Sequence, residues 1–234
     1  MRHLFATIAD RYDFITRLLS YGQDRRWKAR LIALASITSR DRVLDLACGT
    51  GDLLFAAAGR ARLAVGVDIT HRMLELAIRR AVKARRTAVG RPGTGRHTLA
   101  FMTADMLALP FGEARFDVVT PGSGLRNVPG LRAALVEMHR VLAPGGRLLS
   151  LDFDRPDNPA IRALYLGYLT IVGSVLGCVL HRDPDTYRYI SESIRLYPGA
   201  AGVARLMEEA GLTGVRVVRV LGGLLAIHVA QKAA

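Results

Sequence analysis

The sequence predicts an α/β protein whose mostly parallel sheet is covered by helices on both faces, and three observations lead to this prediction. Short apolar runs of strand length alternate with helical segments from residue 43 to residue 153. The first run leads through a glycine turn directly into a helix-compatible segment, residues 53–58. The last two predicted strands, residues 215–220 and 224–230, are separated only by a short turn, so they must pair in antiparallel fashion.

The chain is long enough, at 234 residues, to form one such domain with additions and to bury a full core. Its two cysteines, Cys48 and Cys178, do not suggest a disulfide framework. The start of the chain lacks the apolar stretch of a signal peptide. We therefore expect the protein in a reducing cytoplasm.

The chain is organised around residues 43–52, which read Val-Leu-Asp-Leu-Ala-Cys-Gly-Thr-Gly-Asp. An apolar run that fits a buried strand ends there at a Gly-x-Gly turn, and a helix-compatible segment follows at once. Glycine lacks a Cβ and accepts positive φ, so Gly49 and Gly51 allow a ligand to lie directly against backbone N–H groups, near the positive end of the helix. We expect a cofactor above this turn.

The positions of acidic residues indicate which cofactor binds. The dinucleotide fingerprint requires a third glycine, which is absent here, and Asp52 would lie close to a pyrophosphate. Instead, Asp45 stands four positions before the first glycine, and the next predicted strand, residues 63–68, ends in Asp68, where a carboxylate can accept both hydroxyls of a ribose. This arrangement resembles the first two motifs of the class I S-adenosylmethionine-dependent methyltransferases, which implies a Rossmann-like sheet with a C-terminal antiparallel hairpin.

The other elements are assigned from the same periodicities. Apolar residues recur at helical spacing in residues 3–35, which predicts one or two amphipathic helices; these either pack on the sheet or cover a ligand site. Strands are predicted at residues 99–103, 116–120 and 147–153, helices at 73–84, 131–142 and 203–210, an exposed loop at 87–97, and a turn at 143–146. Ligands of open parallel sheets lie beyond the carboxyl ends of the strands, so the segment 121–128 is expected at the site.

Residues 163–180 contain no charged side chain and reach the lower length limit of about 17 residues for a membrane-spanning helix. Gly173 and Gly177 form a Gly-x-x-x-Gly motif of the kind that packs transmembrane helices. However, a span here would separate the last strands from their sheet, and the segment leads back into the polar residues 181–185. We therefore expect a helix pair that covers the active site with a strongly apolar inner face.

The chain carries 33 Lys and Arg against 20 Asp and Glu, a formal net charge of +13. Such a surplus fits nucleic acid, anionic lipid, or a solvated arginine-rich surface. Aromatic residues make up only 6% of the chain and rarely alternate with basic ones, so no stacking platform for nucleic acid is expected. An anionic membrane surface and simple solvation of the arginines remain open.

Several motifs narrow the resemblance to one family. They are Ile8-Ala9-Asp10-Arg11-Tyr12-Asp13, Leu19-Ser20-Tyr21-Gly22 through Arg26-Trp27, residues 44–52, Leu109-Pro110-Phe111, Gly124-Leu125-Arg126-Asn127-Val128, Glu137-Met138-His139-Arg140-Val141-Leu142 with Pro144-Gly145-Gly146, Tyr187-Arg188-Tyr189 with Glu192-Ser193-Ile194, and Gly222-Gly223 with Ala226-Ile227-His228. With these motifs the chain resembles the ubiquinone/menaquinone biosynthesis C-methyltransferases over nearly its whole length. The combination is specific, because generic methyltransferases share only the glycine turn and Asp68.

The resemblance implies transfer of a methyl group from S-adenosylmethionine, which leaves as S-adenosylhomocysteine, to a ring carbon of a polyprenylated quinol, either demethylmenaquinol or a ubiquinone-pathway benzoquinol. A reduced ring is needed because a hydroquinone that loses a phenolic proton becomes nucleophilic at the adjacent carbon. One domain is implied, with an N-terminal helical cap (residues 1–38), a cofactor-binding core (39–155), a helical insertion that covers the substrate (156–198), and a terminal helix with a hairpin (199–234). The expected location is the cytoplasm, peripheral to the inner face of the cell membrane, and a homo-oligomer is left open.

The resemblance also assigns site residues. The expected cofactor-binding residues are Asp45, Gly49, Thr50, Gly51, Asp68, Asp105, Met106 and Gly122. Arg126 and Asn127 match the family's proposed catalytic pair. An arginine with a pKa above ~12 does not serve as a free base, so Arg126 is expected to hold the phenolate or an activating water and Asn127 to orient it. The alternative for Arg126 is a structural role at the following helix or sheet edge.

Four side chains are expected to line the substrate pocket, and these are Tyr12, Ser123, Tyr165 and His228. Tyr12 lies on an apolar helix face and His228 in a terminal strand, so packing in the core is the alternative for both. The family usually has Phe where this chain has Ser123, which suggests an enlarged site or a looser loop. No metal ion is expected.

Two other functions remain open from the sequence. One is methylation of another small molecule or of RNA, although the chain lacks an Asn-Pro-Pro-Tyr type motif after the fourth predicted strand, which weighs against methylation of nucleobase amines. The other is a non-catalytic scaffold that retains the cofactor pocket, and only Ser123 supports it.

Overall fold

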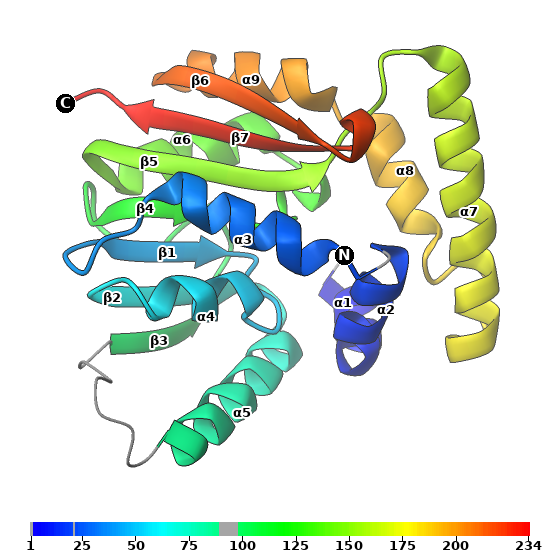
Figure 1. Ribbon diagram of the computed structural model, residues 1–234, viewed down its shortest axis with the longest axis horizontal. Coiled ribbons are helices and arrows are strands. Elements are labelled where there is room, and N and C mark those ends of the chain that lie inside the picture. Colours follow the sequence, from blue (N-terminus) through cyan, green and yellow to red (C-terminus); the bar gives the residue numbers. More distant parts are fainter. Residues whose placement is uncertain (1, 21, 89–97) are drawn as a thin grey trace.

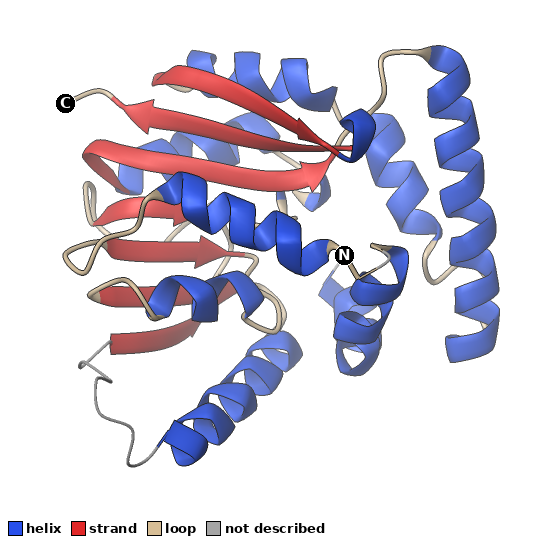
Figure 2. Ribbon diagram, in the orientation of Figure 1, coloured by secondary structure: helices blue, strands red, loops and turns tan. Residues whose placement is uncertain are grey.

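A computed structural model of the protein describes residues 2–20, 22–88 and 98–234. Seven strands form one sheet in the order β3-β2-β1-β4-β5-β7-β6 (Figure 2). They are β1 (Arg42–Leu46), β2 (Leu63–Asp68), β3 (Thr98–Thr103), β4 (Phe116–Thr120), β5 (Leu142–Phe153), β6 (Leu212–Val220) and β7 (Leu225–Lys232). The first five pair in parallel, and β7 is antiparallel to both of its neighbours. The predicted parallel sheet with a terminal antiparallel hairpin is confirmed.

Helices cover both faces of this sheet (Figure 1). They are α1 (Arg2–Ile8), α2 (Tyr12–Leu19), α3 (Asp24–Ala35), α4 (Asp52–Ala58), α5 (His71–Ala88), α6 (Leu131–Val141), α7 (Pro159–His181), α8 (Arg188–Leu196) and α9 (Gly199–Glu209), with short 3₁₀ turns η1 (Ala9–Arg11), η2 (Leu125–Asn127) and η3 (Leu221–Gly223). The predicted loop at 87–97 falls outside the described residues except for its first two positions, which end α5. The helices α1, α2, α7 and α8 gather beyond the carboxyl ends of the parallel strands.

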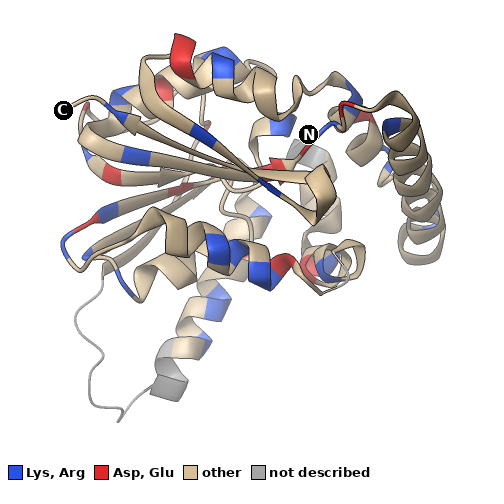
Figure 3. Cartoon of the chain, turned by 45° about the horizontal axis from the view of Figure 1, so that its top comes forward, with Lys and Arg blue, Asp and Glu red and all other residues tan. Residues whose placement is uncertain are grey.

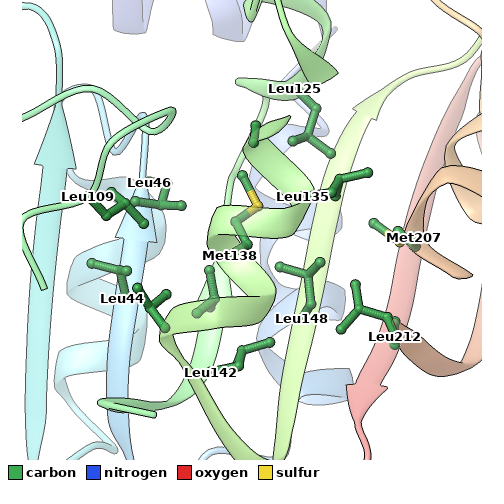
Figure 4. Packing of buried hydrophobic residues seen from close by; sticks show 14 of the residues in the cluster. Leu44, Leu46, Leu109, Leu125, Leu135, Met138, Leu142, Leu148, Met207 and Leu212 are labelled. Atoms are coloured by element: carbon green, nitrogen blue, oxygen red, sulfur yellow. The ribbon is translucent and has the colours of Figure 1, made fainter. Parts of the chain in front are cut away.

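The core has two layers because each central strand is buried on both faces. Consecutive residues of one strand enter opposite clusters: Leu44 belongs to the cluster that contains residues of α6 and α9, whereas Val43 belongs to the cluster that contains residues of α3 and α4. Figure 4 shows the first layer, where Met138 of α6 lies between Leu44 and Leu148 of the sheet and Leu135 of the same helix lies nearer Leu148 than Leu44. This alternation explains why the strands read as continuous apolar runs.

One predicted turn belongs to a strand. The segment 143–146 lies within β5, although the pairing of this strand with β4 shifts from Leu142 opposite Phe116 to Arg147 opposite Val118. Gly145 has φ +71°, a conformation that glycine accepts without a Cβ penalty. The glycines therefore form a bulge inside β5 instead of a break before it.

The charge-free segment also differs from the prediction. It forms one continuous helix, α7, of 23 residues, and α8 packs against it. Gly173 lies against Tyr187, where an added Cβ would come within 3.3 Å of the tyrosine Cβ, and Gly177 lies against the chain at Asp183 and Pro184. The Gly-x-x-x-Gly motif thus serves close packing on the segment that leads into α8.

The inner face of α7 is apolar as expected, and its outer face is apolar too, which was not predicted from the sequence. Leu164, Ile171, Val175 and Val179 are between 56% and 77% exposed. Within the described part of the chain, α7 is the single helix whose length and composition would allow it to cross a membrane. Figure 3 shows its ribbon almost free of charged residues between its ends. We name these four side chains the α7 stripe.

Candidate active site

A cavity of about 450 Å³ lies at the carboxyl ends of β1, β2 and β4, within the range of roughly 300 to 1,000 Å³ typical of ligand sites. It is lined by these predicted cofactor residues: Asp45, Gly49, Thr50, Asp68, Asp105, Met106 and Gly122. Gly51 does not line it, but with φ +92° it ends the turn as the N-cap of α4. We call this space the cofactor cavity.

Asp68 closes the glycine turn from the neighbouring strand. Its Oδ2 accepts the backbone N–H of Gly49 at 2.9 Å and its Oδ1 accepts that of Thr70 at 2.7 Å. Burial raises the pKa of Asp68, and the two N–H donors oppose this rise. Each carboxylate oxygen can accept a further hydrogen bond, so the same side chain can hold the turn and bind hydroxyl groups of a ligand.

Asp45 is the most deeply placed acid of the cavity. Its Oδ1 accepts the Thr120 hydroxyl at 2.7 Å, while its buried Oδ2 makes no hydrogen bond of normal geometry. Burial raises the pKa of Asp45 to about 7, although Thr120 and the Leu54 backbone N–H favour its charged form. A buried carboxylate oxygen without a partner is costly, so this atom is suited to receive a donor from a ligand.

The charges of the cofactor cavity fit S-adenosylmethionine. Four carboxylates line it, those of Asp45, Asp52, Asp68 and Asp105, against one basic side chain among the described residues, that of Lys28. S-adenosylmethionine carries a sulfonium and an ammonium group and a single carboxylate, whereas a dinucleotide would bring two phosphates to these acids. The residues present therefore suit the methyl donor and disfavour a pyrophosphate.

A second cavity of about 580 Å³ adjoins the first. Four residues line both cavities: Tyr12, Lys28, Ser123 and Leu151. The walls of the second are mainly apolar and tyrosine side chains from α2, α7, α8 and η3, including the predicted Tyr165. We call it the apolar cavity. An apolar molecule within it would meet the cofactor cavity at Ser123.

Arg126 lies against the apolar cavity with a 6% exposed side chain. Its Nε donates to Asp152 Oδ1 at 2.9 Å, its backbone N–H donates to Asp152 Oδ2 at 3.1 Å, and one terminal nitrogen donates to Ser193. The guanidinium also stands over the rings of Phe153 and Tyr189, at 4.9 and 5.9 Å from their centroids. Burial lowers the pKa of Arg126, but Asp152 and the tyrosines outweigh burial and raise it. The charge is therefore permanent.

The two predicted catalytic residues face different cavities. Asn127 lines the cofactor cavity, and its buried Oδ1 has no hydrogen-bond partner among the described residues. Arg126 lines the apolar cavity. The 3₁₀ turn η2 thus places a carboxamide and a cation on the two sides of the junction.

Tyr12 covers the glycine turn. A Cβ added to Gly49 would lie 3.9 Å from the Tyr12 ring. Around it, Asp13 accepts the Thr50 hydroxyl at 2.5 Å, Arg80 bonds to the Thr50 carbonyl, and Arg72 pairs with Asp10. The N-terminal helices therefore cover the ligand site as well as packing on the protein.

His228 lies in neither cavity, contrary to the sequence-based expectation. The imidazole is buried in β7, 3.1 Å from the Ser150 hydroxyl and 3.0 Å from the Ala200 carbonyl. Burial lowers the pKa of His228. Its neutral ring joins β7 to β5 and α9, a structural role.

Neither Asp152 nor Lys28 is among the site residues predicted from the sequence. Asp152 stands near the carboxyl end of β5, as Asp68 does in β2, and this position is a signal that could have identified it. Lys28 follows the Arg-Trp pair of a family motif. Packing explains why a glycine stands at position 124, since an added Cβ would lie 2.6 Å from the Cβ of Ala47 in the glycine turn.

The fold and the site are those of a class I S-adenosylmethionine-dependent methyltransferase. Among solved structures, one similar fold is an S-adenosylmethionine-dependent methyltransferase of Thermotoga maritima, described as a possible histamine N-methyltransferase, with a TM-score of 0.68, 17% identity and 99% of each chain covered. At this identity the likeness concerns the fold alone.

The family is shown by sequence. The model of the ubiE/COQ5 methyltransferase family matches residues 1–232, so the chain belongs to that family. It is 40% identical over 231 residues to a demethylmenaquinone methyltransferase of Thermus thermophilus, covering 98% of this chain and 100% of the relative. It is 35% identical to a ubiquinone/menaquinone biosynthesis C-methyltransferase of Francisella tularensis subsp. novicida, covering 98% and 89%. The predicted family resemblance is confirmed.

Proposed function

We propose that this methyltransferase transfers the methyl group of S-adenosylmethionine to a ring carbon of a polyprenylated quinol. The observation that carries the proposal is the apolar cavity, which meets the cofactor cavity at Tyr12, Lys28, Ser123 and Leu151. Its walls suit an isoprenoid chain, and the relatives named above act in quinone biosynthesis. Methylation of RNA is disfavoured, because the cavity walls are mainly apolar and the two basic side chains that line it, Lys28 and Arg126, are paired with aspartates instead of being free for a phosphate backbone.

The chemistry requires a nucleophilic ring carbon. The quinol loses a phenolic proton, and electron density moves to the adjacent carbon. That carbon forms the new bond to the methyl group while the bond between sulfur and methyl carbon breaks, releasing S-adenosylhomocysteine. The carbon then loses its own hydrogen as a proton, which restores the aromatic ring, and the phenolate oxygen regains a proton from water. One proton is therefore released overall for each methyl group transferred.

Arg126 supports this reaction as a fixed positive charge. Its guanidinium is held by Asp152 and Ser193 and flanked by aromatic rings, so it cannot swing away. A preorganised cation in a water-poor site stabilises a phenolate strongly. Asn127 is placed to orient the reacting groups from the cofactor side, with a carboxamide oxygen that has no other partner among the described residues.

Tyr12 and Tyr165 would line the site without acting as bases. Burial raises the pKa of both phenols, so they stay protonated near neutral pH. Their hydroxyl groups can donate hydrogen bonds, and their rings provide apolar walls. Their contribution is to enclose and align the quinol ring.

The test uses purified protein, methyl-labelled S-adenosylmethionine and chemically reduced demethylmenaquinone or demethylated benzoquinone with a short prenyl tail. Label should appear on the ring of one or both quinols and not on the oxidised quinones. Binding of S-adenosylhomocysteine is measured in the same preparation. Clear binding with no labelled quinol would contradict the proposal, and label on RNA would replace it.

We further propose that the enzyme works at the inner face of the cell membrane, with the α7 stripe in contact with lipid. Leu164 belongs both to the stripe and to the wall of the apolar cavity, so a prenyl chain can pass from lipid to the site along apolar surface. Arg155 and Arg162 near one end of α7, with Arg182 at the other, offer positive charge to anionic headgroups, worth roughly 1 kcal/mol each.

Two matched variants test this placement. Val175→Asp and Val179→Asp put charges on the stripe at positions outside the wall of the apolar cavity. Val136→Asp on α6, half-exposed at a distant site, is the control. The first two should lose flotation with anionic vesicles yet keep activity on a short-tailed quinol in detergent, whereas the control should float like the parent. Undiminished flotation of both stripe variants would exclude this contact surface.

A further inference from the structure

Lys28 is the one basic side chain, among the described residues, that lines the cofactor cavity. S-adenosylmethionine brings one carboxylate into a space otherwise lined by four carboxylates. An uncompensated carboxylate there would be repelled by its surroundings. We propose that Lys28 binds the α-carboxylate of the methionine moiety of S-adenosylmethionine and thereby selects ligands with an amino-acid end.

The position of Lys28 fits this role. It lies in the first half of α3, and its Nζ is 2.7 Å from Asp52 Oδ2 and 3.2 Å from Asp24 Oδ2. An ammonium group has three N–H donors. Two point to these aspartates, and the third is available to a ligand in either cavity that Lys28 lines. The side chain is 21% exposed, so it is held between the aspartates but reachable.

The order of the strands decides which end of the ligand meets Lys28. Asp105 follows β3, Asp68 ends β2, Asp45 lies in β1 and Gly122 follows β4, and these strands are successive neighbours in the sheet. A ligand whose ribose lies at Asp68 and whose base lies toward Asp105 must extend its other end toward β1 and β4. The Lys28 ammonium stands at this end, because it is 2.7 Å from Asp52, the first residue of α4 after the glycine turn that follows β1.

Asp45 and Lys28 then offer opposite charges to the two charged groups of the methionine moiety. The partnerless Oδ2 of Asp45 suits the ammonium group of the methionine end, and the third Lys28 donor suits its carboxylate. Asp52 carries a second ion pair, with Arg80 at 2.6 Å, so it does not depend on Lys28 alone for charge compensation. This leaves Lys28 able to share its charge with a ligand. The proposal concerns the methyl donor and does not depend on which acceptor is methylated.

The experiment compares two ligands that differ only in the carboxylate: S-adenosylmethionine and decarboxylated S-adenosylmethionine. Dissociation constants are measured by calorimetry on the full chain without a methyl acceptor. Lys28→Gln should weaken S-adenosylmethionine binding by about 10- to 100-fold, the usual effect of losing a charge-assisted hydrogen bond. Decarboxylated S-adenosylmethionine should bind the Lys28→Gln variant as tightly as it binds the parent protein, or more tightly, because this ligand has no carboxylate for the lysine to bind.

Three further variants make the result decisive. Lys28→Arg keeps the charge and should bind S-adenosylmethionine within a few-fold of the parent. Lys83→Gln on α5 removes a lysine elsewhere and should change neither constant. The double variant Lys28→Gln/Asp24→Asn also removes the Asp24 carboxylate, which would otherwise lose its lysine partner. This double variant is used in place of Lys28→Gln if the single variant does not fold. Each preparation is checked by its thermal unfolding midpoint.

Two outcomes would overturn the proposal. Equal losses for both ligands in Lys28→Gln would show that the lysine only positions the glycine turn through Asp52. Unchanged binding of S-adenosylmethionine would show that the carboxylate is bound elsewhere, and a raised KM for the quinol alone would then assign Lys28 to the apolar cavity.

Discussion

The two cavities that meet at Ser123 are built in opposite ways. The cofactor cavity is made by turns that directly follow neighbouring strands, and acidic side chains dominate its charge. The apolar cavity is made by α2, α7, α8 and η3, which lie far apart in the sequence and meet only in the folded chain. A charged site can thus be specified by short stretches of sequence at the ends of neighbouring strands. An apolar cavity, in contrast, depends on how helices from distant parts of the chain pack together.

The largest expected effect concerns Arg126, whose buried charge lines the apolar cavity. Arg126→Ala should lower turnover by at least about 100-fold, because the phenolate loses a preorganised cation. It should also cost roughly 3–5 kcal/mol of unfolding free energy, since Asp152 is left buried without its partner. Kinetics with the reduced quinol and urea unfolding measure the two losses.

A paired variant separates these losses. Arg126→Gln with Asp152→Asn removes both charges, so it should recover most of the stability while turnover stays low. The affinity for S-adenosylhomocysteine should remain near that of the parent in both variants. Recovery of turnover together with stability would mean that Arg126 has only a structural role.

The next largest effect concerns the protonation of Asp45 in the cofactor cavity. In the folded, ligand-free protein the pKa of Asp45 is about 7, against an ordinary 3.8. The folded state therefore keeps a proton on Asp45 that the unfolded state releases, so the contribution of Asp45 to the free energy of unfolding falls as pH rises from about 4 to about 7. The stability of Asp45→Asn relative to the parent should thus grow by up to about 3 kcal/mol between pH 5 and pH 8. Denaturation at several pH values measures this, and a constant difference would contradict it.

Asp68→Asn should have a smaller effect, and this effect should be confined to ligand binding in the cofactor cavity. An amide cannot accept the Gly49 and Thr70 N–H groups with both of its polar atoms, so the turn loosens and S-adenosylhomocysteine should bind about 10- to 100-fold more weakly. Binding of a quinone to the apolar cavity should not change. Trp27, the single tryptophan, lines that cavity and can report quinone binding by fluorescence quenching. Loss of both affinities would show that the cavities are not independent.

The smallest effect is expected at the junction itself. Ser123→Phe supplies the ring that the family usually carries, and this ring would narrow the shared wall. Quinone affinity should rise a few-fold, consistent with burial of extra apolar surface, while S-adenosylhomocysteine affinity changes less than about two-fold. Trp27 quenching and calorimetry check the two values. A large loss of cofactor affinity would show that Ser123 holds the loop after β4 in place.

Much of the cofactor cavity could be predicted because its signals are local. The run from Val43 to Asp52 specifies strand, turn and helix in one stretch, and Asp68 ends the next strand. In a parallel sheet the carboxyl ends of neighbouring strands meet at one edge, so these residues come together without further information. The tertiary structure added the place of Lys28 and the hydrogen bonding of the Asp45 oxygens, and it showed that Gly51 caps α4 without lining the cavity.

Less of the apolar cavity could be predicted, since periodicity shows that a helix is amphipathic but not what covers each face. His228 illustrates the limit: its family motif suggested the pocket, yet pairing of β7 with β5 turns the ring toward Ser150. The α7 helix illustrates it again. Its charge-free run predicts an apolar inner face, but it does not show that Leu164 and Val179 remain exposed, because only the face of α7 with Leu169 and the two glycines is buried.

The sequence by itself determined the sheet, the glycine turn, the methyl donor and the family, because each depends on neighbouring residues or on strand order. The tertiary structure alone decided three things: the burial of Arg126 against Asp152, the meeting of the two cavities at Ser123, and the outward apolar face of α7. The first two bring together segments distant in the chain, and the third depends on which face of α7 such segments cover. Their contact depends on packing of whole helices, which short-range patterns do not specify.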